Sequence, residues 1–464
     1  MTGAVDFAAL RRREFSRLDA TGTAYLDHTG SALYPESLVQ RDARRLLRRV
    51  LGNPHSESAP SLASTEALEE ARSLTLRFFT ADPAEYDLVF TPNASGAIRI
   101  LAEAFPFRAG SRLVLTADNH NSVNGLAVPA ARRGAVVARV PLDAHLRACA
   151  PQRWLSPAAQ PSLFAFPAQS NFSGVRHPLT WVTDAQARGY RVLLDAAAFA
   201  STNALSLADV PADFVAVSYY KLFGYPAGVG ALIARRKALA ALERGYFAGG
   251  TVQVVSVQND VSRLKAGAAA FEDGPPNFLA MPAVCDGLRW LTEIGLTAIE
   301  QRVRALTSRL LAGLLDLGDR VRVYGPVDGG ARGGVVAFNL YAAGRVIDYE
   351  VVEAAARRAG IAIRGGCFCN PGAAEHAFGL PAARALACLD GDFSVPRFRA
   401  CMGGSPVGAL RASCGAATSE GDLDRLLDLV GELTQVVRRP VAARALRRAR
   451  RPRHRIGATS AGPR

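Results

Sequence analysis

Short apolar runs alternate with longer helical stretches through the first half of the chain, and this alternation sets the expected fold. The segments between the runs carry the three-to-four-residue spacing of amphipathic helices, as do residues 36–50 and 62–80 before them. The runs are YDLVFTPN, SRLVLTADNH, AVVARVPL, SLFAFPAQS, RVLLDAAAF, DFVAVSYYKLF and GVGALIARR. Runs this rich in Val, Leu and Phe are typical of a mostly parallel sheet that helices cover on both faces.

A second pattern begins after the last of these runs. Helical spacing covers 282–318 and leads into four short runs, RVRVYG, GGVVAFNL, IAIRGG and ALRASCG, before a closing helical stretch, EGDLDRLLDLVGEL. The Gly-, Pro- and Ala-rich segment 378–408 predicts an irregular loop or lid. We therefore predict an N-terminal arm (1–25), a large domain (26–290), a small domain (291–437) that the N-terminal segment can also contact, and a tail (438–464).

The net charge of +14 is concentrated at the C-terminus, where residues 438–464 hold ten arginines and no acidic residue. Without them the excess is +4, so we expect a disordered, solvated tail on an ordinary globular body. A polyanion or membrane-surface contact is the less favoured interpretation. The chain shows neither the apolar core of a signal peptide nor a membrane-spanning run, so we expect a soluble, cytoplasmic protein. Seven scattered cysteines then indicate free thiols rather than a disulfide framework.

Polar groups follow the ends of several predicted strands, which is where ligands bind in open α/β sheets. Ala94 and Ser95 open a helix, so their backbone amides can face an anion. His120 lies beyond the next strand and can stack on a flat ring. Gln169 and Asn171 can donate hydrogen bonds to a phenolate-type oxygen. Each of these residues alone is as easily explained by helix capping or turn formation.

Asp195 and Lys221 follow the two strands after that. A carboxylate at the end of an apolar run needs a partner, and a protonated pyridine nitrogen is a good one. Lys221 is one of only three lysines, with Lys237 and Lys265, in a chain that otherwise uses Arg. Lysine can form an imine whereas arginine cannot, and apolar surroundings would lower its pKa. With Ser218 near enough to reach a phosphate, the ordered set describes a pyridoxal-phosphate site.

With these motifs the chain resembles the class V aminotransferase group of fold-type-I pyridoxal-phosphate enzymes, which includes the cysteine desulfurases. Within that group it is most similar to the N-terminal desulfurase domain of molybdenum cofactor sulfurases. The matching stretches run from about residue 24 to 430: YLDHTGSALYP, GNPHS, FTPNASGAI, DNHNSVNG, PAQSNFSG, LLDAAAF, SYYKLFGYPAGVGAL, GGTV, FEDGPPNFLA, RGGCFCNPGA and ALRASCG. The resemblance implies an α/β fold, with a large domain on a mixed, mostly parallel seven-stranded sheet and a smaller α+β C-terminal domain.

The resemblance also implies a role for each matching residue. Lys221 would form the imine with pyridoxal 5'-phosphate, Asp195 would pair with the pyridine nitrogen, and His120 would stack on the ring. Asn171 would sit near the ring hydroxyl. The phosphate would be held by Ala94, Ser95 and Ser218, and by Thr251 of the partner subunit in a homodimer. Arg411 would clamp the substrate carboxylate, and Cys369 would be the nucleophilic cysteine.

Two positions depart from the common desulfurase pattern and one departs from the sulfurase pattern. Tyr220 replaces the usual His before the lysine, and Ala198 replaces a common Gln or His after the aspartate; both resemble the sulfurases. Ala374 stands where the sulfurases commonly have another Cys. Those proteins usually carry a second domain that binds the molybdenum cofactor, which this chain does not show. The resemblance therefore leaves the sulfur acceptor open.

Cys367 and Cys369 lie one residue apart, which is the wrong spacing for two familiar sites. A zinc site needs about four spaced ligands and a redox pair needs Cys-x-x-Cys, so no metal is predicted. Cys367 is either an inert thiol or a supporting residue. Cys149, Cys285 and Cys401 are most simply packing or loop residues, and the role of Cys388 is undetermined.

The sequence supports three hypotheses of decreasing strength. The first is a cysteine desulfurase that moves sulfur from L-cysteine to Cys369 as a persulfide, releases L-alanine, and passes the sulfur to a molybdenum cofactor, a carrier protein or a biosynthetic intermediate. The second is a carbon–sulfur lyase or epimerase of the same family, without a persulfide and acting on a larger amino acid. The third is a nucleic-acid-binding protein that uses its basic tail.

Overall fold

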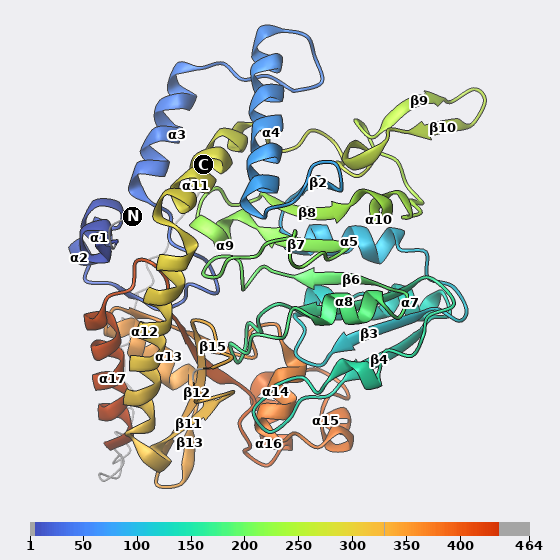
Figure 1. Ribbon diagram of the computed structural model, residues 1–464. Helices are drawn as coiled ribbons and strands as arrows, with labels where there is room; N and C mark the ends of the chain where they lie inside the picture. The colour runs from blue at the N-terminus through green and yellow to red at the C-terminus, as the bar shows by residue number, and fades with distance from the viewer. Residues whose placement is uncertain (1–4, 329, 436–464) are drawn as a thin grey trace, which may run out of the picture.

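The computed structural model describes residues 5–328 and 330–435, and the predicted basic tail lies outside them. Its centre is a seven-stranded sheet in the order β2-β8-β7-β6-β5-β3-β4 (Figure 1). β8 runs antiparallel to both of its neighbours and the other pairs are parallel. The strands are β2 (Tyr86–Thr91), β3 (Arg112–Thr116), β4 (Val136–Val140), β5 (Ser162–Pro167), β6 (Tyr190–Asp195), β7 (Phe214–Ser218) and β8 (Gly230–Arg235). The predicted mixed, mostly parallel sheet is confirmed.

Alternate residues of these strands are buried on opposite faces of the sheet. Leu113 and Leu115 belong to one apolar cluster, whereas Val114 between them belongs to the other. One face is covered by α5 (Ala94–Ala104), α7 (Ala127–Arg132) and α10 (Arg236–Ala240). The other is covered by α4 (Ala59–Phe78), α8 (Trp181–Gln186) and α11 (Met281–Ile294). Burial on both faces explains why the strands read as continuous apolar runs.

A second, smaller unit is built on an antiparallel sheet in the order β11-β12-β16-β15, with β13 paired to β12. Its strands are β11 (Val321–Tyr324), β12 (Val335–Ala342), β13 (Arg345–Ile347), β15 (Arg364–Gly366) and β16 (Ala409–Ser413). The accompanying helices are α12 (Leu296–Leu315), α13 (Tyr349–Arg358) and α17 (Glu420–Gln435). The single helix predicted over 282–318 is two helices, because Gly295 adopts a φ of 85° that ends α11.

The N-terminal segment packs against this smaller unit (Figure 1). It contains α1 (Phe7–Glu14), α2 (Ser16–Ala20) and β1 (Ala24–Tyr25), and α3 (Glu36–Arg48) follows. β1 pairs in parallel with β14 (Ile361–Ala362). Arg11 forms a buried ion pair with Asp422 of α17 at 2.6 Å. The two ends of the described chain therefore meet in one unit.

The segment 378–408 corrects two predictions. It follows α14 (Pro371–Phe378) and holds two short helices, α15 (Ala382–Cys388) and α16 (Val395–Cys401), instead of an irregular loop. The helix propensity of alanine in AARALAC outweighs the turn residues that flank it. A disulfide joins Cys388 to Cys401, so the expectation of free thiols was wrong for these two. The other five cysteines are free.

A long hairpin projects from the body on the side of β2 and β8 (Figure 1). It is formed by β9 (Val252–Ser256) and β10 (Val261–Leu264), which pair in antiparallel register. Val254, Val257 and Val261 on this hairpin are exposed. Among the described residues, no helix is both long and apolar enough to cross a bilayer.

Candidate active site

A cavity of about 140 Å³ opens at the carboxyl ends of β5, β6 and β7, beside the start of α5. It brings together seven residues that the sequence predicted for one site: Ala94, Ser95, His120, Asn171, Asp195, Ser218 and Lys221. Gln169 and Tyr220 also line it. Strands that are adjacent in a parallel sheet end at the same edge, so their following residues converge there.

Lys221 lies in α9 (Tyr219–Phe223), which begins as soon as β7 ends. Burial lowers the pKa of its amine; the charge of Asp195 opposes this effect, and the charges of Arg411 and Arg364 add to it. A lowered pKa increases the neutral fraction, which is the form that attacks a carbonyl carbon. Gly224 caps the helix with a φ of 82°, where its α-carbon passes close to the backbone of Tyr34.

Asp195 and His120 approach the cavity from the ends of neighbouring segments. Asp195 is 8% exposed, and its Oδ1 accepts a hydrogen bond from the Ala197 amide at 3.0 Å. His120 caps α6 (Asn121–Asn124), and its Nδ1 accepts from the Ser122 amide at 3.1 Å. Burial lowers the pKa of His120 despite the opposing charge of Asp195. The imidazole is therefore neutral near pH 7 and can take up a proton.

The first turn of α5 supplies donors for an anionic group. The Ala94 amide donates to Ser218 Oγ at 2.8 Å, and Ser95 Oγ lies 2.6 Å from Ser122 Oγ. These hydroxyls and amides stand at the positive end of an eleven-residue helix. Gly230 lets β8 approach closely, because a Cβ there would lie 2.5 Å from the backbone of Asn93. The donor set and the small residues around it fit a phosphate.

Arg411 reaches the same region from β16 of the smaller unit. It is buried, and it donates to Asp27 Oδ1 at 2.8 Å and to the Asn171 carbonyl at 3.0 Å. Asp27 also accepts from Arg364, at 2.6 Å and 3.0 Å to Oδ2. Asp27 was not predicted as a site residue, although it lies within the motif YLDHTGSALYP. A carboxylate directly after the apolar run AYL was the only available signal.

The loop that carries Cys369 is held against this cavity. The Asn121 amide donates to the Cys369 carbonyl at 2.7 Å, and Asn171 Nδ2 donates to the Phe368 carbonyl at 2.7 Å. Cys369 is exposed, and it is close enough to contribute to the electrostatic environment of Lys221. The Asn171 amide, predicted to sit near a ring hydroxyl, thus lines the cavity and also binds this loop. Cys367 is exposed two residues away.

Thr251 is the one predicted cofactor-binding residue that lies elsewhere. It is buried at the base of the β9–β10 hairpin, and its hydroxyl donates to the Ala248 carbonyl at 2.8 Å. It does not line the Lys221 cavity of its own chain. Its predicted role requires a second subunit.

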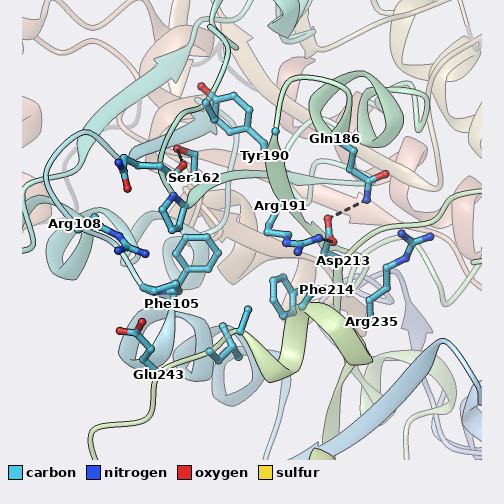
Figure 2. A pocket seen from close by; sticks show the side chains of 18 of the residues that line it. Phe105, Arg108, Ser162, Gln186, Tyr190, Arg191, Asp213, Phe214, Arg235 and Glu243 are labelled. Carbon is cyan, nitrogen blue, oxygen red and sulfur yellow. Dashed lines mark hydrogen bonds and ion pairs between the residues drawn. The ribbon is translucent and has the colours of Figure 1, made fainter.

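A larger cavity, of about 620 Å³, lies at the opposite, amino-terminal edge of the sheet (Figure 2). Asp213 at its centre is bound by Gln186 at 2.9 Å and by Arg191 at 3.0 Å. Arg108 and Arg235 also line it. None of the residues predicted for the site is there. The smaller cavity, with its titratable groups, is therefore the candidate active site.

The match to known families agrees with this placement. Residues 24–426 match the family described as aminotransferase class V. The chain belongs to this family. The match covers both structural units, from β1 to α17, and includes every residue of the candidate site.

Relatives within the family include molybdenum cofactor sulfurases. The protein of that name from Solanum lycopersicum is 33% identical over 91% of this chain, and that from Bos taurus is 34% identical over 91%. These matches cover 56% and 51% of the relatives' own length. The chain therefore spans about half the length of the curated relatives it matches.

Solved structures of a cysteine desulfurase and of a cystine C–S lyase share this fold. A cysteine desulfurase from Thermococcus onnurineus is 25% identical, with a TM-score of 0.78 over 92% of this chain and 98% of its own. The cystine C–S lyase C-DES, solved with cysteine persulfide, has a TM-score of 0.69 at 18% identity, over 90% of this chain and 99% of its own. The predicted fold class is thus confirmed, and the fold alone is compatible with a desulfurase and with a lyase.

Proposed function

We propose that this protein is a pyridoxal-phosphate-dependent cysteine desulfurase, which moves sulfur from L-cysteine onto Cys369 and releases L-alanine. The observation that carries the proposal is the position of Cys369. Its loop comes from the smaller unit and is hydrogen-bonded to Asn121 and Asn171 at the rim of the Lys221 cavity. A lyase that releases pyruvate needs no thiol of its own there.

The cofactor is pyridoxal 5'-phosphate, and the cavity residues fit it. When bound, the cofactor acts as an electron sink for the substrate carbons. Lys221 would hold it covalently, Asp195 would pair with its ring nitrogen, and the first turn of α5 with Ser218 would bind its phosphate. The neutral His120, which lines the same cavity, would face the ring and could move a proton. Arg411 fixes the substrate carboxylate, which aligns the substrate sulfur with Cys369.

The sulfur step balances without an external oxidant. The Cys369 thiolate attacks the substrate sulfur, and an S–S bond forms as the substrate's carbon–sulfur bond breaks. The electron pair of the broken bond stays with the substrate carbons, and their protonation gives alanine. The enzyme keeps the sulfur as a persulfide on Cys369, which an acceptor thiol or a molybdenum cofactor can remove. The exposure of Cys369 supports such a transfer.

The test is the product of L-cysteine turnover. Holoenzyme should yield alanine and, without acceptor, about one persulfide per subunit, detected by mass spectrometry on the peptide that contains Cys369. Cys369→Ser should keep the visible absorbance of the bound cofactor and lose both products. Cys149→Ser, at another exposed free cysteine, is the matched control and should behave as wild type. Pyruvate and ammonia in place of alanine would instead indicate the lyase.

The active form of the protein is a homodimer in this proposal. Val254, Val257 and Val261 are 49%, 91% and 48% exposed on the projecting hairpin, which is a costly position for apolar side chains in a monomer. Thr251 at its base could then reach the phosphate of the neighbouring site. Sedimentation of the holoenzyme should report a dimer, and Val257→Asp should shift it towards monomer. Val327→Asp, at an exposed position of the smaller unit, should not.

A further inference from the structure

The loop that carries Cys369 has an uncommon backbone. Phe368 and Cys369 adopt φ angles of 57° and 56°, a left-handed conformation that residues other than glycine rarely adopt. Two such residues in succession need external support. The support comes from the Asn171 and Asn121 hydrogen bonds, and from Asn370, whose Nδ2 donates to Asn171 Oδ1 at 2.9 Å.

The side chain of Phe368 points away from solvent and packs on Arg411. The ring is 8% exposed, and its centroid lies 4.8 Å from the guanidinium carbon of Arg411. Phe172 packs against the same ring with centroids 5.3 Å apart. The contact is a cation–π pair, which is strongest when both partners are shielded from water.

Asn171 and Phe368 therefore connect the arginine predicted to bind the substrate carboxylate with the loop that carries Cys369. Asn171 accepts a hydrogen bond from Arg411 through its carbonyl and donates one to Phe368 through its amide. Phe368 covers Arg411 with its ring, and its peptide leads directly into Cys369. The guanidinium, the Phe368 ring and the backbone that precedes the thiol therefore form one connected set of contacts.

We propose that Phe368 is a positioning residue that couples carboxylate binding at Arg411 to the placement of the Cys369 thiol. This inference rests on the proposed function, because it assigns the carboxylate to Arg411 and the sulfur to Cys369. A bound carboxylate adds a further contact to Arg411 beyond those of Asp27 and Asn171, the guanidinium holds the Phe368 ring, and the ring holds the loop docked. An empty Arg411 leaves the loop freer to open towards an acceptor.

The first measurement uses steady-state kinetics of holoenzyme variants. Phe368→Tyr keeps the flat ring, whereas Phe368→Leu keeps apolar bulk without it. The leucine variant should raise KM for L-cysteine about 3- to 30-fold, the range expected for losing a shielded cation–π contact. It should also lower kcat, whereas the tyrosine variant should retain both values. Phe378→Leu is the control, because Phe378 packs on Phe172 with centroids 6.2 Å apart in the same aromatic cluster.

The second measurement tests, without catalytic turnover, whether ligand binding at Arg411 changes the accessibility of Cys369. L-Alanine is the probe, and alkylation of Cys369 by iodoacetamide is followed by mass spectrometry. Saturating L-alanine should slow alkylation in wild type and in Phe368→Tyr, but not in Phe368→Leu. Cys149 serves as the exposed reference, and buried Cys414 reports loss of folding.

The outcomes separate this inference from the proposed function. Absence of protection in wild type, equal protection in Phe368→Leu, or a tyrosine variant as impaired as the leucine variant would each overturn the coupling. If wild type binds L-alanine with the expected protection but makes no alanine from L-cysteine, the proposed function fails and the coupling stands.

Discussion

Asp27 holds two arginines together at the junction of the two units, and its replacement by asparagine tests what that carboxylate contributes. Arg364 and Arg411 are directly opposite each other in the β15–β16 pair. Like charges in this arrangement destabilise a sheet unless a counter-ion lies between them. Asp27→Asn keeps the shape and one acceptor oxygen, and removes only the charge.

The expected loss follows from the exposure of each partner. The Arg411 side chain is 3% exposed and that of Asp27 is 13%, so this is a buried pair. Breaking a buried pair by removing one partner costs about 3–5 kcal/mol. The Arg364 side chain is 49% exposed, and solvent reduces its share to below about 1 kcal/mol. Because asparagine keeps one hydrogen bond, we expect a loss of about 3 kcal/mol in the free energy of unfolding at pH 7.

The loss should depend on pH in a defined direction. Burial alone would raise the pKa of Asp27, but the hydrogen bonds and charges of Arg364 and Arg411 outweigh it and hold the pKa below its usual value. A lowered pKa stabilises the folded state above the unfolded pKa of about 4, and this contribution is lost as the pH falls through the folded pKa. The difference between wild type and variant should therefore be full at pH 7 and shrink below about pH 4.

Urea denaturation followed by circular dichroism measures both effects. Asp424→Asn is the control, because Asp424 pairs with Arg309 in an ion pair in which both side chains are about half exposed, 48% and 47%. The control should leave the midpoint almost unchanged. If Asp27→Asn at pH 7 behaves like the control, the buried pair contributes nothing net. If its deficit does not shrink as the pH is lowered from 7 to well below 4, the charge is not the cause.

Three further changes have defined outcomes. Lys221→Ala should abolish the visible absorbance of bound pyridoxal 5'-phosphate while leaving the far-ultraviolet dichroism unchanged; retained absorbance would mean that another group holds the cofactor. Gly224→Ala should lower the melting temperature far more than Gly22→Ala. Both glycines have a positive φ, which destabilises an alanine by about 1–2 kcal/mol. Only at 224 would the added Cβ also lie 2.2 Å from the Tyr34 nitrogen. Cys388→Ser removes a disulfide between cysteines 13 residues apart, and should lower the free energy of unfolding by about 3 kcal/mol. It should also speed proteolysis within 378–408, whereas Cys149→Ser should have neither effect.

The sheet and most of its ligand-facing edge could be predicted because both depend on local patterns. Each strand is a largely apolar run, and the residues that follow the parallel strands β5, β6 and β7 lie at one shared edge. The prediction of a single helix over 282–318 was wrong because Gly295 has a positive φ. In the sequence, such a glycine cannot be distinguished from one that a helix tolerates. The prediction of free thiols was wrong for a related reason, because composition does not show that two short helices bring Cys388 and Cys401 together.

The partners of the site residues could not be predicted, because they come from distant parts of the chain. Asp27 and Arg411 are 384 residues apart, and Asn171 and Phe368 are 197 apart. No periodicity links such positions. Thr251 shows the remaining gap: its predicted role depends on a second chain, which one sequence does not specify.

The meeting of the two chain ends in one unit has a consequence for synthesis on the ribosome. Residues 86–235 contain every strand of the large sheet and can pair as soon as they emerge. β1 must wait for residues 361–362, and Arg11 for Asp422, which lies 411 residues later. The apolar residues Leu10, Phe15 and Leu18 pack with Trp290 and Ile294 of α11 and with Ala417, so their cluster is complete only after residue 417. Contacts between segments this far apart in sequence form late in folding, and their apolar residues stay available for non-native association until then.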